Sequence, residues 1–96
     1  PQKKRQTYRK VIEFGAIAAG VLLVVPHGIT GLSQFTHIYG TCITVTPEYR
    51  PLPYVDIINI QNQILLKCDP TNVVIGNGGT APAIVSGLVV LEYLLN

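Results

Sequence analysis

The chain has 96 residues, of which 48% are hydrophobic and only 12% are charged. This length gives one domain, near the lower limit of what folds on a single core, with about half the usual share of charge. So few charges cannot cover the surface of so small a domain, and we therefore expect a homo-oligomer that buries part of its apolar surface.

The net charge of +2 is unevenly distributed along the chain. Five of the seven basic residues lie within the first ten positions, and the remainder has two basic and five acidic residues, a net charge of −3. Residues 1–6 are either a solvated leader or a basic arm. As an arm, they would dock on an acidic partner through Lys3, Lys4 and Arg5, together with Tyr8 at the start of the first strand. No nucleic acid is expected as a partner, because the body has no basic face with interleaved aromatic residues.

The first half of the chain predicts three strands. Residues 7–14 alternate between apolar and polar side chains, as expected of a half-buried strand. Residues 21–25 are continuously apolar, which predicts a strand buried on both faces. Residues 34–46 form the longest alternating segment, and Gly40 within it indicates a bulge or a close approach by a neighbouring backbone.

The apolar run at residues 15–25 follows basic residues, as in a secretory signal. Glu13 interrupts this arrangement, and no small-residue cleavage site follows the run. The run is also far shorter than the roughly 20 residues that a membrane-spanning helix needs. We therefore expect no membrane span.

The second half predicts four further strands, at residues 54–59, 63–68, 73–75 and 84–94. Residues 47–53 contain three prolines, which favour an irregular loop or an edge strand, since proline donates no backbone hydrogen bond. Asp69 begins a turn by accepting hydrogen bonds from its own backbone, and residues 76–82 form a glycine-rich loop. Residues 84–94 are apolar on both faces, which is typical of a central strand.

These segments predict an all-β fold. Frequent short strands separated by turns favour a small antiparallel β-sandwich, jelly-roll-like in type. The sandwich is expected to form one domain over residues 7–96, preceded by the extended basic arm of residues 1–6.

No motif for catalysis or for phosphate binding occurs, so we expect no enzyme, no catalytic residue and no cofactor. Cys42 and Cys68 are separated by 25 residues and have no paired spacing, which favours free thiols on strands. A disulfide, or a zinc site with His27 and His37, remains an alternative. His27 lies between a proline and a glycine, where its ring can bond the open backbone groups.

The markers along the chain form an ordered set: Tyr8-Arg9-Lys10-Val11-Ile12-Glu13-Phe14-Gly15, Val25-Pro26-His27-Gly28-Ile29, Ile38-Tyr39-Gly40-Thr41, Pro51-Leu52-Pro53-Tyr54-Val55 and Val90-Leu91-Glu92-Tyr93. This set resembles a β-sandwich module of tailed-bacteriophage virion proteins. Its candidate structural residues are His27, Gly28, Tyr39, Gly40, Pro51, Pro53, Tyr54 and Tyr93.

The resemblance implies a non-enzymatic structural protein on a tailed-phage virion, as a tail fibre, an appendage or a capsid decoration. It implies a homotrimer, other capsid or tail proteins as partners, and assembly in the host bacterial cytoplasm. The alternative is a receptor- or glycan-binding head, with Tyr49, Tyr54 and Asn77 as candidate ligand-facing residues and a host-surface glycan as partner. The apolar residues 16–25 and the absence of a shaft sequence favour a short subunit seated on the capsid or tail.

Overall fold

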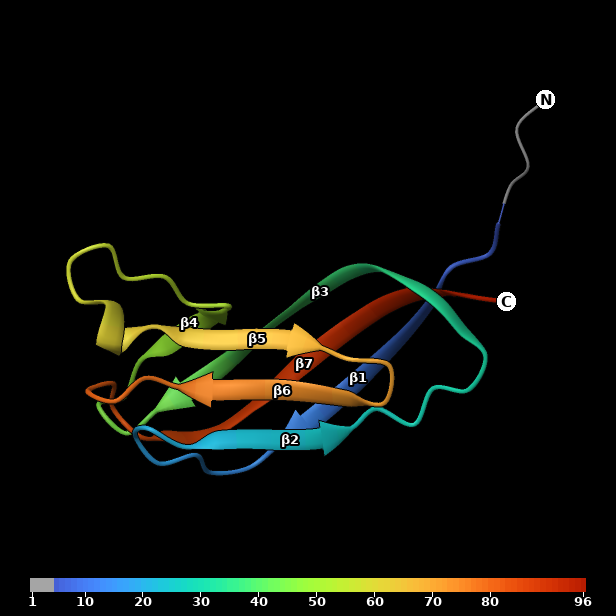
Figure 1. The fold of residues 1–96 in the computed structure, drawn as a ribbon. Coiled ribbons are helices and arrows are strands. Elements are labelled where there is room, and N and C mark those ends of the chain that lie inside the picture. Colours follow the sequence, from blue (N-terminus) through green and yellow to red (C-terminus); the bar gives the residue numbers. More distant parts are fainter. Residues whose placement is uncertain (1–4) are drawn as a thin grey trace.

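A computed structural model describes residues 5–96, which form two antiparallel sheets (Figure 1). The four-stranded sheet has the order β1-β7-β3-β4, and the three-stranded sheet has the order β2-β6-β5 and lies in front of it in Figure 1. The predicted all-β, antiparallel class is confirmed. The elements are β1 (Tyr8–Phe14), β2 (Leu22–Pro26), β3 (Leu32–Thr44), β4 (Tyr49–Leu52), the 3-10 helix η1 (Ile60–Asn62), β5 (Ile64–Cys68), β6 (Asn72–Asn77) and β7 (Ile84–Leu95).

The core takes apolar side chains from both sheets. Its buried members are Phe14, Ile17, Cys42, Leu52, Ile64, Val73, Ile75, Ile84, Val89 and Leu91. Strand β7 is paired with β1 on one side and with β3 on the other, so the predicted central strand is confirmed. Val90 is also buried, although it points away from Val89 and Leu91, so the middle of β7 is covered on both faces.

The prediction that residues 21–25 are buried on both faces is wrong. In β2 only Leu23 and Val25 pack against the core, whereas Leu22 and Val24 are at least half exposed. A continuous run of β-branched residues and leucine fits a strand in either setting, because the pattern does not say whether anything covers the second face. The three-stranded sheet therefore has an uncovered apolar face.

The predicted strand at residues 54–59 is also wrong. Tyr54 pairs with Ile64 through an isolated bridge, and the chain then leaves the sheet as a loop. The Asp56 carboxylate accepts hydrogen bonds from the backbone N–H groups of Ile58 and Asn59, at 2.9 and 3.0 Å. These local bonds use the donors that a strand ladder would need, and the segment folds as a turn instead.

Two details of the predicted strands are explained by close packing. Strand β4 is the edge of its sheet, which places Pro51 where a missing backbone donor is tolerated and confirms the edge-strand prediction. A side chain at Gly40 would collide with the carbonyl oxygen of Leu88, so the close approach expected there is confirmed. The glycine-rich loop begins at Gly78, because β6 continues through Asn77.

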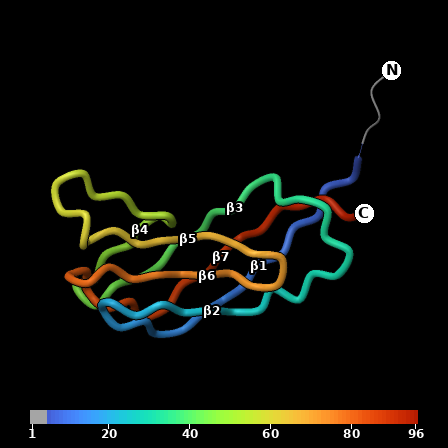
Figure 2. Tube along the Cα trace, viewed as in Figure 1, coloured from blue at the N-terminus to red at the C-terminus, as the bar shows by residue number. Residues whose placement is uncertain are grey.

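The ends of the described chain lie together, opposite the loop that joins β4 to β5 (Figure 2). Tyr8 pairs with Tyr93, and their rings stack with centroids 5.9 Å apart. The Arg5 guanidinium donates a hydrogen bond to the carbonyl oxygen of Leu95 at 2.7 Å. Lys3 and Lys4, the other predicted docking residues of the arm, lie outside the described residues.

Candidate interaction site

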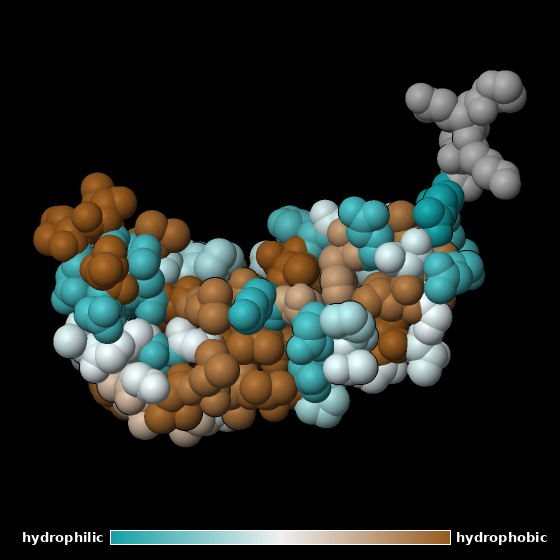
Figure 3. All heavy atoms as spheres, viewed as in Figure 1, coloured by the Kyte–Doolittle hydropathy of each residue, from teal (hydrophilic) through white to brown (hydrophobic). Residues whose placement is uncertain are grey.

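The most exposed apolar feature of residues 5–96 is the loop between β4 and β5. Four aliphatic side chains project from it and form what we call the knob: Val55, Ile57, Ile58 and Ile60. Ile57 and Ile58 are 92% and 93% exposed, almost as open to water as in an unfolded chain. Figure 3 shows this loop as a brown projection at the upper left. Clustered exposure of this kind makes the knob a candidate interaction surface, whereas single exposed apolar residues are ordinary.

A polar frame holds the knob in one shape. Besides accepting the two backbone bonds described above, Asp56 accepts a 2.8 Å hydrogen bond from the Asn62 side chain through its second carboxylate oxygen. That bond, followed by the bonds from the backbone N–H groups of Asn59 and Ile58, lowers the pKa of Asp56. Asn59 also caps η1 by accepting a hydrogen bond from the backbone of Gln61 at 3.1 Å. The loop therefore presents its isoleucines from a hydrogen-bonded scaffold.

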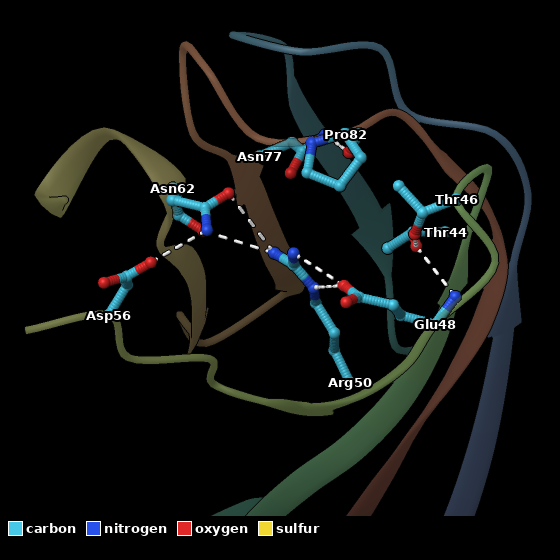
Figure 4. A network of polar contacts seen from close by, with 8 residues as sticks. All are labelled: Thr44, Thr46, Glu48, Arg50, Asp56, Asn62, Asn77 and Pro82. Carbon is cyan, nitrogen blue, oxygen red and sulfur yellow. Dashed lines mark hydrogen bonds and ion pairs between the residues drawn. The ribbon is translucent and has the colours of Figure 1, made fainter. Parts of the chain in front are cut away.

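Arg50 joins this frame to the four-stranded sheet, as Figure 4 shows. Its side chain is buried, and its Nε and Nη2 atoms lie 2.9 and 2.8 Å from one carboxylate oxygen of Glu48. Its Nη1 reaches the backbone and side-chain oxygens of Asn62 at 3.5 and 3.4 Å. The guanidinium carbon lies 4.2 Å from the ring centroid of Tyr54. Arg50 thus connects β4 to both ends of the loop that carries the knob.

A second apolar surface covers the outside of the three-stranded sheet. We call it the outer face; its exposed aliphatic side chains are Leu22, Val24 and Leu65. Leu22 and Leu65 flank Gly76, which is paired with both and carries no side chain of its own, and Val24 is paired with Val74. A groove of about 270 Å³ runs beside Gly76 toward the base of the knob, between β5 and Tyr54. Figure 3 shows brown atoms over the middle of this sheet.

A hollow of about 400 Å³ lies on the four-stranded sheet at Gly87. Its lining includes Glu13, Thr41, Ser86 and Tyr49. Tyr49 is 81% exposed, so its ring is available beside polar side chains. Here an exposed aromatic ring and hydrogen-bonding groups line one cavity, an arrangement that suits a sugar ring.

The other two candidate ligand-facing residues do not join Tyr49. Tyr54 is partly buried under the guanidinium of Arg50 and lines the groove on the other sheet. Asn77 is buried, and its side-chain N–H groups donate to the carbonyl oxygens of Ile17 and Pro82 at 3.4 and 3.1 Å. The three residues therefore do not form one site.

His27 is 1% exposed and bridges two turns. Its Nδ1 accepts a hydrogen bond from the backbone N–H of Ile29 at 3.2 Å, and its Nε2 lies 3.2 Å from the carbonyl oxygen of Asp69. This pair of contacts requires the neutral ring with its proton on Nε2. The His27 carbonyl accepts a 2.6 Å bond from Lys10, next to Gly28, which has a φ of 66°. These contacts indicate a structural role for His27 and Gly28.

The remaining candidate structural residues lie on the four-stranded sheet and at its margin. Gly40 pairs with Leu52, which sits between Pro51 and Pro53, so two of the segments that carry the resemblance lie side by side. The Tyr39 hydroxyl donates to Glu92 at 3.1 Å. His37 stacks on Tyr39 and lies 3.8 Å from Glu92, and Tyr93 packs against Tyr8 and Phe35.

Both cysteines are free thiols, and their burial raises the pKa of each. For Cys68, burial and the neighbouring Asp69 carboxylate raise the pKa to about 11. A thiol with such a pKa is almost entirely protonated at neutral pH and is a poor nucleophile.

Within the part of the chain that the structure describes, no three His, Cys, Asp or Glu side chains are close enough to hold a metal ion. No helix among residues 5–96 is long and apolar enough to span a membrane. Comparison of the chain with protein-family models, with curated proteins and with solved structures finds no match.

The sequence prediction missed the knob because Val55-Asp56-Ile57-Ile58-Asn59-Ile60 has the composition of a strand. A signal for the turn is nevertheless present. Asp56 and Asn59 are three residues apart and follow Pro53, an arrangement that favours local side-chain bonds over a ladder.

Proposed function

We propose that this chain is a non-enzymatic structural protein that works by contact, as an oligomeric β-sandwich of jelly-roll type within a larger assembly. The observation that carries the proposal is the knob. Ile57 and Ile58 are almost fully exposed on a loop that Asp56 and Arg50 hold in place.

Energetics support a contact role for the knob. Fully burying one aliphatic side chain contributes about 1.5–3 kcal/mol, so covering four that are largely exposed is worth roughly 4–9 kcal/mol. A monomer gains none of this. A partner that covers the knob offsets a large part of the 4–15 kcal/mol that association costs.

The ordered set of segments that resembles the tailed-phage module is the reason for proposing a virion as the assembly. In this proposal the chain is a homotrimeric subunit of a capsid decoration, an appendage or a fibre, attached to other virion proteins and assembled in the bacterial cytoplasm. Its basic arm, including Arg5, contacts a neighbouring subunit. No cofactor or nucleic acid takes part.

Incorporation into particles tests this role. Ile57→Ser/Ile58→Ser removes apolar surface from two nearly fully exposed sites, so the fold should persist while incorporation, measured by quantitative mass spectrometry of purified particles, falls strongly. Val11→Ser/Val85→Ser is the matched control, because both valines are about half exposed on the four-stranded sheet. Wild-type incorporation of the knob variant would refute the proposal.

The exposed ring of Tyr49 beside the hollow at Gly87 supports one alternative, a glycan-binding head. A titration with mono- and disaccharides, followed by NMR, would then shift the signals of residues around the hollow. Tyr49→Ala should abolish the shifts, and Tyr49→Phe should keep most of them, because the ring face makes the contact. If no sugar produces shifts at this hollow, the alternative is wrong.

A further inference from the structure

Two apolar surfaces of this chain differ in shape, one projecting and one grooved. The knob ends in Ile57 and Ile58, which are almost fully exposed. The outer face has a groove of about 270 Å³ beside Gly76, bordered by Leu65, Leu66 and Tyr54 and, at the base of the knob, by Val55. A projecting aliphatic pair on one copy therefore has a concave aliphatic counterpart on another.

The two surfaces also carry opposite charge. Asp56 is the acidic residue of the knob loop, and its lowered pKa keeps its carboxylate ionised over a wider pH range. Lys67 lies on the exposed side of β5, two residues from Leu65, and is the basic residue of the three-stranded sheet. Each contact between a knob and an outer face would bring these opposite charges near each other.

The area that each surface offers decides how many contacts a copy must make. At about 30 Å² of surface for each apolar carbon, the knob exposes roughly 400 Å² and the outer face roughly 200 Å². One contact thus buries roughly 600 Å², below the roughly 1,000 Å² of a specific interface. In a closed ring each copy makes two such contacts, one through each surface, and the last contact closes the ring without bringing in another copy, so every copy uses both surfaces.

We propose that the knob of one copy docks in the groove and on the outer face of a second copy, in a closed assembly in which every copy supplies both surfaces. The contact is heterologous, since different surfaces meet, and closure prevents open-ended polymers. This inference rests on the proposed function, because it assigns the contact role of the knob to a second copy of this chain.

Light scattering on purified protein at high micromolar concentration tests the proposal. The wild type should have a mass that is a small multiple of 10.4 kDa. The knob variant, Ile57→Ser/Ile58→Ser, and an outer-face variant, Leu22→Ser/Leu65→Ser, should each be monomeric. The Val11→Ser/Val85→Ser control should keep the wild-type mass. Circular dichroism and thermal melting would establish that every variant is folded.

Mixing the two monomeric variants separates a heterologous contact from other arrangements. The outer-face variant still has a knob and the knob variant still has an outer face, so an equimolar mixture should form a heterodimer that neither variant forms alone. One knob-to-face contact holds this heterodimer, so it should be weaker than the wild-type assembly. A mixture without the heterodimer at millimolar concentration would overturn the proposal, as would a monomeric wild type. If the wild type is monomeric but the knob variant still fails to enter particles, the proposed function stands and the partner of the knob is a different protein.

Discussion

Replacing His27 by three different side chains tests whether its ring contributes through its two hydrogen bonds. Phe keeps a buried ring and removes both bonds. Asn can place its amide oxygen near the position of Nδ1, which preserves the bond from the Ile29 N–H. Gln can place its amide nitrogen near Nε2, which preserves the bond to the Asp69 carbonyl.

The expected loss follows from the burial of the site. An unsatisfied buried backbone group costs about 1–3 kcal/mol. The two bonds of His27 are part-buried and, at 3.2 Å, near the long end of the normal range, so the lower half of this cost, about 1–2 kcal/mol each, applies. His27→Phe should therefore lower the free energy of unfolding by about 2–4 kcal/mol. His27→Asn and His27→Gln should each retain about half of this stability.

Urea denaturation measures these differences. With a slope near 1 kcal/mol per molar urea for a chain of this size, the midpoint for His27→Phe should fall by about 2–4 M. The series belongs in the knob variant, because dissociation of an oligomer would otherwise add to the unfolding free energy. The reasoning is refuted if Phe equals the wild type, or if Asn and Gln are both less stable than Phe. The second result would assign the role of His27 to the packing of its ring against Phe35, whose centroid lies 5.6 Å away.

Four further outcomes are expected. Gly87→Ala should destabilise the protein by about 2 kcal/mol or more in urea melts, because its Cβ would lie 2.5 Å from a core aromatic ring, whereas Gly15→Ala meets nothing within 4 Å and should change little. The rate of alkylation of Cys68 should keep rising with pH up to about pH 11. Because folding raises the pKa of this thiol, the free energy of unfolding should fall as the pH rises from 9 to about 11. Lys67→Glu should weaken self-association about two- to fivefold by ultracentrifugation, through repulsion from the acidic knob loop. Arg50→Met should change the unfolding free energy by less than about 1 kcal/mol, because the Glu48 left behind is about half exposed and can be solvated. It should still weaken self-association, and an unchanged association constant would show that Arg50 does not position the knob.

Much of the fold could be predicted because residues 7–14 alternate between apolar and polar side chains and residues 84–94 are apolar on both faces. Residues 7–14 and 84–94 were placed almost to the residue, since each has side chains that must reach one shared core. The turn at Asp69 was equally predictable: its carboxylate accepts hydrogen bonds from the backbone N–H groups of Thr71 and Asn72, at 2.9 and 2.6 Å. Local chemistry and period-two patterning decide these elements without help from distant parts of the chain.

The candidate site was less predictable because it consists of apolar side chains that stay exposed. Leu22, Val24 and Ile58 are of residue types that are usually buried. The hydrophobic pattern of the sequence does not indicate that nothing covers them in the fold. Arg50 was not singled out either, since an arginine between prolines in an edge segment gives no sign of burial. The pairing that turns Arg50 inward, opposite Cys42, is a property of register and of the loop that closes over it.

The burial of Arg50 is better explained by positioning than by stability. An arginine gains little when its partner Glu48 is about half exposed, because water screens the pair, and the bonds to Asn62 are long. If Arg50 is replaced by an apolar side chain, the Glu48 carboxylate that remains can be solvated, because it is already about half exposed. The geometry of Arg50, however, fixes both ends of one loop: the guanidinium lies over Tyr54 where the chain leaves the sheet, and it holds Asn62 where the chain returns. Asn62 in turn donates a hydrogen bond to Asp56. The shape of the knob therefore depends on Arg50, whose side chain is buried and does not belong to the knob. In a chain with so few charges, this one holds the shape of an exposed apolar loop.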